Sequence, residues 1–133
     1  MISSSSLQAS TLVALGGATG AVLRFHAGRL VGSLVGPDAA FPWGTFSINV
    51  AGSFAMGLLA GWLARHADGG EAWRLLLAVG VLGGFTTFSS FSLETVLLLE
   101  RGMPALAATY VLGSMLAGIG GLFLGLMMIR VAA

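Results

Sequence analysis

The chain has 133 residues, of which 56% are hydrophobic and 8% are charged. Because a soluble domain carries about 25% charged residues, this composition excludes an ordinary water-soluble globule and predicts an integral membrane protein. The chain has no cysteine and a formal net charge of +1. These features exclude a disulfide framework and argue against a nucleic-acid partner, which needs a basic patch.

Charged residues divide the chain into four apolar stretches. A bilayer core about 30 Å thick needs about 20 apolar residues of helix, and each stretch is of that size. We therefore predict an all-α fold with a single membrane domain over residues 1–133. Its four spans are expected near residues 8–34, 42–64, 74–99 and 103–129.

Pairs of glycines at spacing four recur along the predicted spans. Such pairs let helix backbones approach closely in lipid, so they predict a tightly packed bundle made by more than one chain. The pairs are Gly16 and Gly20, Gly28 and Gly32, Gly57 and Gly61, Gly80 and Gly84, and Gly121 and Gly125.

The arginines are almost evenly divided between the two sides of the membrane. One side holds Arg65, Arg74 and Arg130, and the other holds Arg29 and Arg101, with Arg24 near the same end of the first span. Since an excess of positive residues in cytoplasmic loops fixes orientation, this balance predicts insertion in both orientations. An antiparallel dimer then becomes available. The alternative is an orientation fixed by some other feature.

The third span departs from a plain lipid-facing helix. Two glycines, Gly83 and Gly84, precede a run of hydroxyl and phenyl side chains. We expect the helix to break at the glycines, with Thr86 or Thr87 capping the half that restarts. A broken membrane helix is tolerated only where it is buried or lines a cavity. Its carbonyl end suits a cation and its N–H end suits an anion.

Two phenyl rings beyond the expected break share one helix face. Phe88 and Phe91 are three residues apart, and Thr87 and Ser90 lie beside them. Ring edges carry positive potential and hydroxyls donate hydrogen bonds, so together they can line an anion path. The alternative is that the rings fill the core and the hydroxyls bond back to their own helix. Spacing alone favours the second interpretation, because aromatic residues commonly fill protein cores.

Four further polar side chains on the spans also have two interpretations each. Asn49, inside the second span, either joins helices or donates to an anion at a pore mouth. Arg24 either makes an electropositive vestibule or extends to the membrane surface. Tyr110 and Ser114, four apart on the fourth span, either form a polar track or hydrogen-bond a neighbouring helix.

The remaining ionisable groups carry weaker signals. Glu94 either pairs with an arginine or marks the wet end of the third span. We expect no metal or proton chemistry at His26 or His66, because neither has a second ligand close in sequence. No nucleophile–base pair is evident, so we predict that the protein is not an enzyme.

Three ordered motifs resemble the CrcB/Fluc family of fluoride channels. They are residues 16–24 (GGATGAVLR), residues 44–52 (GTFSINVAG) and residues 83–94 (GGFTTFSSFSLE). The likeness covers nearly the whole chain. It implies a passive fluoride channel in the inner cell membrane, built as an antiparallel, dual-topology homodimer with two fluoride pathways.

The resemblance also implies roles for named residues. Phe88 and Phe91 would present ring edges to fluoride, with Asn49 donating a hydrogen bond along the path. Tyr110 and Ser114 would belong to a polar track on the fourth span.

A structural sodium ion at the dimer centre is implied as well, held by backbone carbonyls of Gly83 and Thr86 from both chains. The sequence departs from the family at two points. Ser90 stands where the family usually has threonine, and Gly118 stands where a further hydroxyl is expected, one turn beyond Ser114.

Two other classes of membrane protein share some of these features. A proton-coupled small multidrug transporter also has four short spans and dual topology, but it needs a membrane-embedded carboxylate, normally in the first span, which has none here. A non-transporting scaffold subunit would pack by its glycines and would have no need of hydroxyls beside a helix break.

Overall fold

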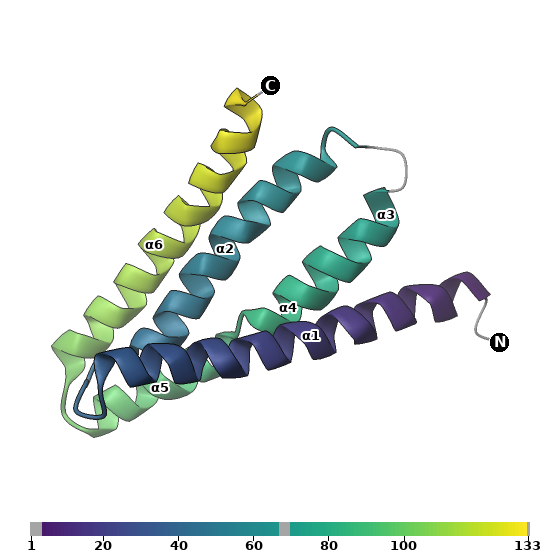
Figure 1. Ribbon diagram of the computed structural model, residues 1–133. Coiled ribbons are helices and arrows are strands. Elements are labelled where there is room, and N and C mark those ends of the chain that lie inside the picture. The colour runs from purple at the N-terminus through teal and green to yellow at the C-terminus, as the bar shows by residue number, and fades with distance from the viewer. Residues whose placement is uncertain (1–3, 67–69, 133) are drawn as a thin grey trace.

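The computed structural model describes residues 4–66 and 70–132, and the described part is entirely helical (Figure 1). Three spans are single helices, and the third span consists of several pieces. The single helices are α1 (Ser4–Val35), α2 (Trp43–Leu63) and α6 (Pro104–Val131). The third span comprises α3 (Gly70–Trp73), the π-helix η1 (Arg74–Leu82), α4 (Gly83–Phe85) and α5 (Phe88–Glu100).

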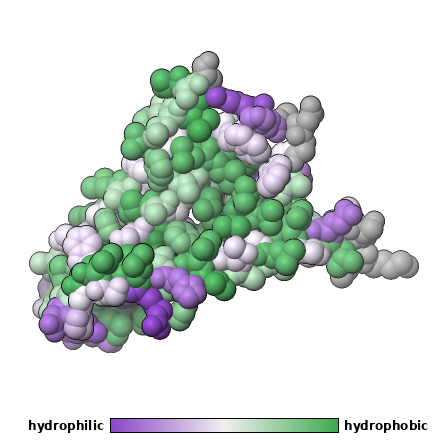
Figure 2. Space-filling model, in the orientation of Figure 1, coloured by the Kyte–Doolittle hydropathy of each residue, from purple (hydrophilic) through white to green (hydrophobic). Residues whose placement is uncertain are grey.

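Four stretches of helix are long and apolar enough to cross a membrane. They are Ser5–Val35, Trp43–Leu63, Gly70–Glu100 and Pro104–Val131. Hydrophobic residues cover most of the visible surface, and hydrophilic residues gather toward its ends (Figure 2). The prediction of an all-α protein with four membrane-spanning stretches is confirmed, and the chain is a multi-pass membrane protein.

Helices α2 and α6 run side by side in the same direction and approach through glycines (Figure 1). A Cβ atom added to Gly57 would lie 2.0 Å from the backbone oxygen of Leu122, and one added to Gly125 would lie 2.4 Å from that of Phe54. Real Cβ atoms do not come so close, so the two backbones are in direct contact. The glycine spacing noted above marks this contact.

Helix α1 packs in the same way against the first half of the third span. A Cβ atom on Gly16 would lie 2.2 Å from the Leu76 oxygen, and one on Gly84 would lie 2.5 Å from the Gly17 oxygen. The π-helix η1 forms part of this contact. The spacing of apolar residues in the sequence does not predict a π-helix, whose turn is wider than that of an α-helix.

The break in the third span lies two residues beyond the position we expected. Gly83 and Gly84 are helical, whereas Thr86 (φ −80°, ψ 157°) and Thr87 (φ −148°, ψ 120°) are extended. The prediction that the glycines break the helix is therefore wrong. Gly84 serves close packing on α1 instead, and the chain leaves the helix where Asn49 of α2 offers hydrogen bonds to its backbone.

Few side chains of the described residues are buried within this single chain. The buried hydrophobic residues are Ile48, Leu98, Ala107 and Tyr110. The last three form one small core where α5 meets α6, with Phe91 packed against it. Because side-chain burial is so limited, the fold within this chain depends on the close contacts between helices.

The contact of α2 with α6 predicts a sharp difference between two glycines. We expect Gly57→Ala to lower the free energy of unfolding by about 1–3 kcal/mol, because its methyl group would overlap the Leu122 carbonyl. Gly120→Ala is the matched control, since a Cβ atom there meets nothing within 4 Å. Thermal unfolding of the purified protein in detergent measures both. Equal stability of the two variants would contradict the close contact.

Candidate functional site

The break in the third span is closed by one side chain from α2. The Asn49 Nδ2 amide donates to the Thr87 carbonyl at 3.0 Å, and the Thr87 backbone N–H donates to Asn49 Oδ1 at 2.8 Å. Both backbone polar groups of Thr87, a residue that has left the helix, are thereby satisfied, as a bilayer requires. Asn49 thus joins two helices, which was one of its two interpretations. Its second amide N–H has no partner among the described residues.

Thr87 caps the helix that restarts after the break. Its Oγ1 accepts a hydrogen bond from the Ser90 backbone N–H at 3.3 Å, and its hydroxyl donates to Ser90 Oγ at 3.1 Å. The expectation that Thr86 or Thr87 caps the second half is confirmed for Thr87. With Ser90 Oγ accepting from Thr87, the Ser90 hydroxyl proton is left for a further acceptor.

A cavity of about 260 Å³ lies beside the break, between α2, α5 and α6. Polar groups from the break and from α2 share it with apolar side chains. Its lining residues are Asn49, Gly52, Ser53, Met56, Thr86, Thr87, Phe88 and Leu122. The cavity therefore brings hydrogen-bond donors to the level where the backbone leaves the helix.

Phe88 and Phe91 lie together at the start of α5, as their spacing predicts. Their ring centroids are 5.7 Å apart, and the Phe91 centroid lies 5.1 Å from that of Tyr110. Phe91 is half-buried, whereas Phe88 is 78% exposed and lines the cavity. Packing within this chain thus accounts for Phe91 but not for Phe88.

Glu94 joins α5 to α2 and α6 through two hydroxyl donors. Thr45 Oγ1 donates to one carboxylate oxygen at 2.8 Å, and the Tyr110 hydroxyl donates to the other at 2.7 Å. Tyr110 is fully buried. In the described part of the chain Glu94 makes no ion pair, and its partners are hydroxyls and not an arginine.

Sequence reasoning missed Thr45, although a signal was available. Thr45, Asn49 and Ser53 follow one another at spacing four and therefore share one face of α2. On α6, Ser114 lies one turn beyond Tyr110, and its Oγ is buried without a hydrogen-bond partner among the described residues. These two polar faces run along the α2–α6 pair in the same direction.

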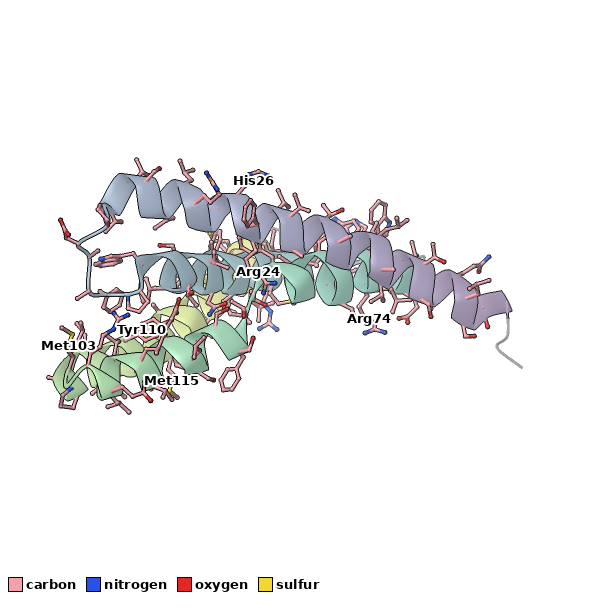
Figure 3. The ribbon with its side chains drawn as sticks, turned by 90° about the horizontal axis from the view of Figure 1, so that it is seen from below. Arg24, His26, Arg74, Met103, Tyr110 and Met115 are labelled. Atoms are coloured by element: carbon pink, nitrogen blue, oxygen red, sulfur yellow. The ribbon has the colours of Figure 1, made fainter. Side chains whose placement is uncertain are left out.

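Arg24 reaches the break from α1. Its guanidinium donates to the Thr86 carbonyl over a long 3.4 Å, and the side chain points toward the third span (Figure 3). Arg24 therefore brings positive charge to the level of the break and does not extend to the membrane surface. His26, two residues on, lies on the outer side of α1 (Figure 3).

The two carbonyls that the family resemblance assigns to sodium fit a cation. In an unbroken helix the Thr87 N–H would bond to the Gly83 carbonyl, but here it donates to Asn49. The Thr86 carbonyl accepts only the long Arg24 contact among the residues described. Freed backbone carbonyls at a helix break are the oxygens that coordinate sodium in membrane proteins. No cluster of acidic, histidine or cysteine side chains competes as a metal site in residues 4–66 and 70–132.

The chain is similar to proteins of known family over almost its whole length. Residues 11–126 match the family model described as CrcB-like protein, Camphor Resistance (CrcB). A protein of Novosphingobium aromaticivorans named fluoride-specific ion channel FluC is 64% identical over 93% of this chain and 98% of its own length.

Two further relatives carry the same name. The protein of Erythrobacter litoralis is 51% identical over 96% of each chain, and that of Rhodospirillum centenum is 53% identical over 90% of this chain and 94% of its own. Their names describe ion channels and not enzymes. Four membrane spans and a match over residues 11–126 show that this chain belongs to the CrcB family.

Proposed function

We propose that this protein is a passive, selective channel that exports fluoride through the inner cell membrane. The observation that carries the proposal is the polar lining at the break in the third span. There an unpaired N–H of Asn49 and the hydroxyl of Ser90 lie near a cavity of about 260 Å³ that Phe88 also lines. The name of the relatives, fluoride-specific ion channel, supports the same function.

Fluoride is small and strongly hydrated, so a pore must replace its water with close donors. The amide of Asn49 and the hydroxyl of Ser90 are neutral donors of that kind, and Thr87 leaves the Ser90 proton available by donating to the Ser90 oxygen. The ring edges of Phe88 and Phe91 add positive potential without a full charge. A neutral lining attracts the anion without binding it so tightly that it cannot leave.

The path continues in both directions from the break. Arg24 supplies the positive charge of a vestibule that draws anions toward the lining. On α6, Tyr110 and the unpaired hydroxyl of Ser114 form a polar track toward the connector end. Fluoride enters cells as its neutral conjugate acid and is trapped inside as the anion, so the membrane potential alone drives export.

The working unit in this proposal is an antiparallel homodimer with two pathways. Two observations support it. Phe88 is 78% exposed at a helix start that must lie within the membrane, and a second chain would cover it. The arginines are nearly balanced between the two sides, which permits insertion in both orientations.

A sodium ion at the centre of this dimer would be held by the Gly83 and Thr86 carbonyls of both chains. Its positive charge would neutralise the carbonyl dipoles that converge where the two breaks meet. Within this chain, Asn49 keeps the Gly83 carbonyl available, because it takes the Thr87 N–H that a continuous helix would direct to that carbonyl.

Ion efflux from liposomes that hold the purified protein tests the proposed channel. With potassium inside and valinomycin as the charge shunt, we expect rapid fluoride efflux and no chloride efflux, read by ion-selective electrodes. Without valinomycin, fluoride should stay inside, because passive movement of an anion alone builds an opposing potential. Efflux that needs a proton gradient instead, or equal leakage of both anions, would sink the channel proposal.

A second prediction concerns the two phenyl rings. We expect Phe88→Ile and Phe91→Ile each to reduce fluoride efflux at least about tenfold, because isoleucine offers no positive ring edge. Phe123→Ile is the matched control, since Phe123 is also well exposed but lies on α6. Phe88 is the more decisive position, because its packing within the chain is slight. Full efflux by Phe88→Ile would show that its ring does not contact the ion.

A third prediction tests dual topology in cells. Arg29→Gln with Arg101→Gln should fix one orientation, and Arg74→Gln with Arg130→Gln the opposite one, because each pair shifts the charge balance. We expect each variant alone to lose fluoride resistance and the two expressed together to restore it. Full resistance from each variant alone would rule out the antiparallel dimer.

A further inference from the structure

The proposed polar track loses a hydroxyl at Gly118. On α6, Tyr110, Ser114 and Gly118 follow one another at spacing four and so share one face. The first two carry hydroxyls, and the third carries no side chain. The structure shows what lies opposite the gap. A Cβ atom on Gly118 would meet a single neighbouring atom within 4 Å, Ser53 Oγ of α2, at 3.6 Å.

Ser53 belongs to the polar face of α2, one turn beyond Asn49. It lines the cavity of about 260 Å³ at the break together with Asn49 and Thr87. Because α2 and α6 run in parallel, with Ser53 opposite Gly118 and Gly57 opposite Leu122, the two polar faces advance in step. Ser53 therefore stands beside the missing hydroxyl and in the same cavity as the break.

The bonding of the Ser53 hydroxyl also differs from that of several other hydroxyls on these helices. Thr19, Thr95 and Thr109, for example, donate to a carbonyl of the preceding turn. Ser53 makes no such bond and no other hydrogen bond within the described residues, although it is only half-exposed. A hydroxyl in a membrane helix that does not bond to its own backbone, and that lines a cavity, is available to bind a ligand there.

We propose that Ser53 is a further fluoride-binding residue, which donates a hydrogen bond to the ion on the side of the break that Gly118 leaves bare. The inference rests on the proposed function, because the ligand is the ion that the channel carries. In this arrangement α2 supplies three successive polar residues along the pathway. Asn49 and Ser53 donate to the ion directly, whereas Thr45 acts by way of its hydrogen bond to Glu94. Fluoride thus meets a donor from α2 where α6 can offer none.

Fluoride efflux from liposomes tests this assignment. We expect Ser53→Ala to lower efflux at sub-saturating fluoride about tenfold, the effect of one hydrogen bond to a charged partner. The rate at saturating fluoride should change less, because the loss is one of binding. Thr109→Ala is the matched control, since it removes a hydroxyl that bonds to its own helix. Size-exclusion chromatography verifies that each variant remains folded.

A second pair of variants separates hydrogen bonding from packing. In the Ser53→Ala background, Gly118→Ser should restore efflux, because its hydroxyl reaches the same space from α6. Gly118→Ala should not, since it fills that space without a donor. Rescue by both replacements or by neither, or an unchanged Ser53→Ala, would overturn the assignment. If the unmodified protein carries no fluoride, the proposed function itself fails, and the role of Ser53 falls with it.

Discussion

The arrangement of the polar site depends on how the backbone of Thr87 is satisfied in the middle of a membrane. Where the third span leaves the helix, the Thr86 N–H still bonds to the Leu82 carbonyl, whereas the N–H and carbonyl of Thr87 lose their helical partners. Each would cost several kcal/mol if left unpaired in lipid. The amide of Asn49 replaces both partners at once. This reciprocal pair fixes α2 against the break, and the cavity, the cap at Thr87 and the freed carbonyl of Gly83 all follow from it.

The sequence predicts the spans well because the membrane imposes a simple rule on them. Charge is expensive in lipid, so the gaps between charged residues mark the four spans found in residues 4–66 and 70–132. The cap at Thr87 was also predictable, since threonine is a common N-cap. The position of the break could not be predicted, because it depends on a hydrogen bond between residues 38 positions apart. The nearby Gly83 and Gly84 predicted a break at the wrong position.

The carboxylate of Glu94 shows a second limit of local patterns. Its partners, Thr45 and Tyr110, lie on two other helices, and no spacing within the third span predicts them. The sequence does show that Thr45 and Asn49 are four residues apart, as are Tyr110 and Ser114. These spacings therefore identify the polar face of each helix. Only the fold shows that the two faces lie side by side, on the neighbouring helices α2 and α6.

The backbone contact between α2 and α6 has a consequence for how any ion is discriminated. Gly57 and Gly125 bring the two backbones into direct contact, so no flexible side chain lies between them that could change their separation. The walls that carry Asn49 and Ser114 therefore hold a constant separation. In the proposed channel such walls would exclude a larger halide sterically, because the pathway could not widen to admit it.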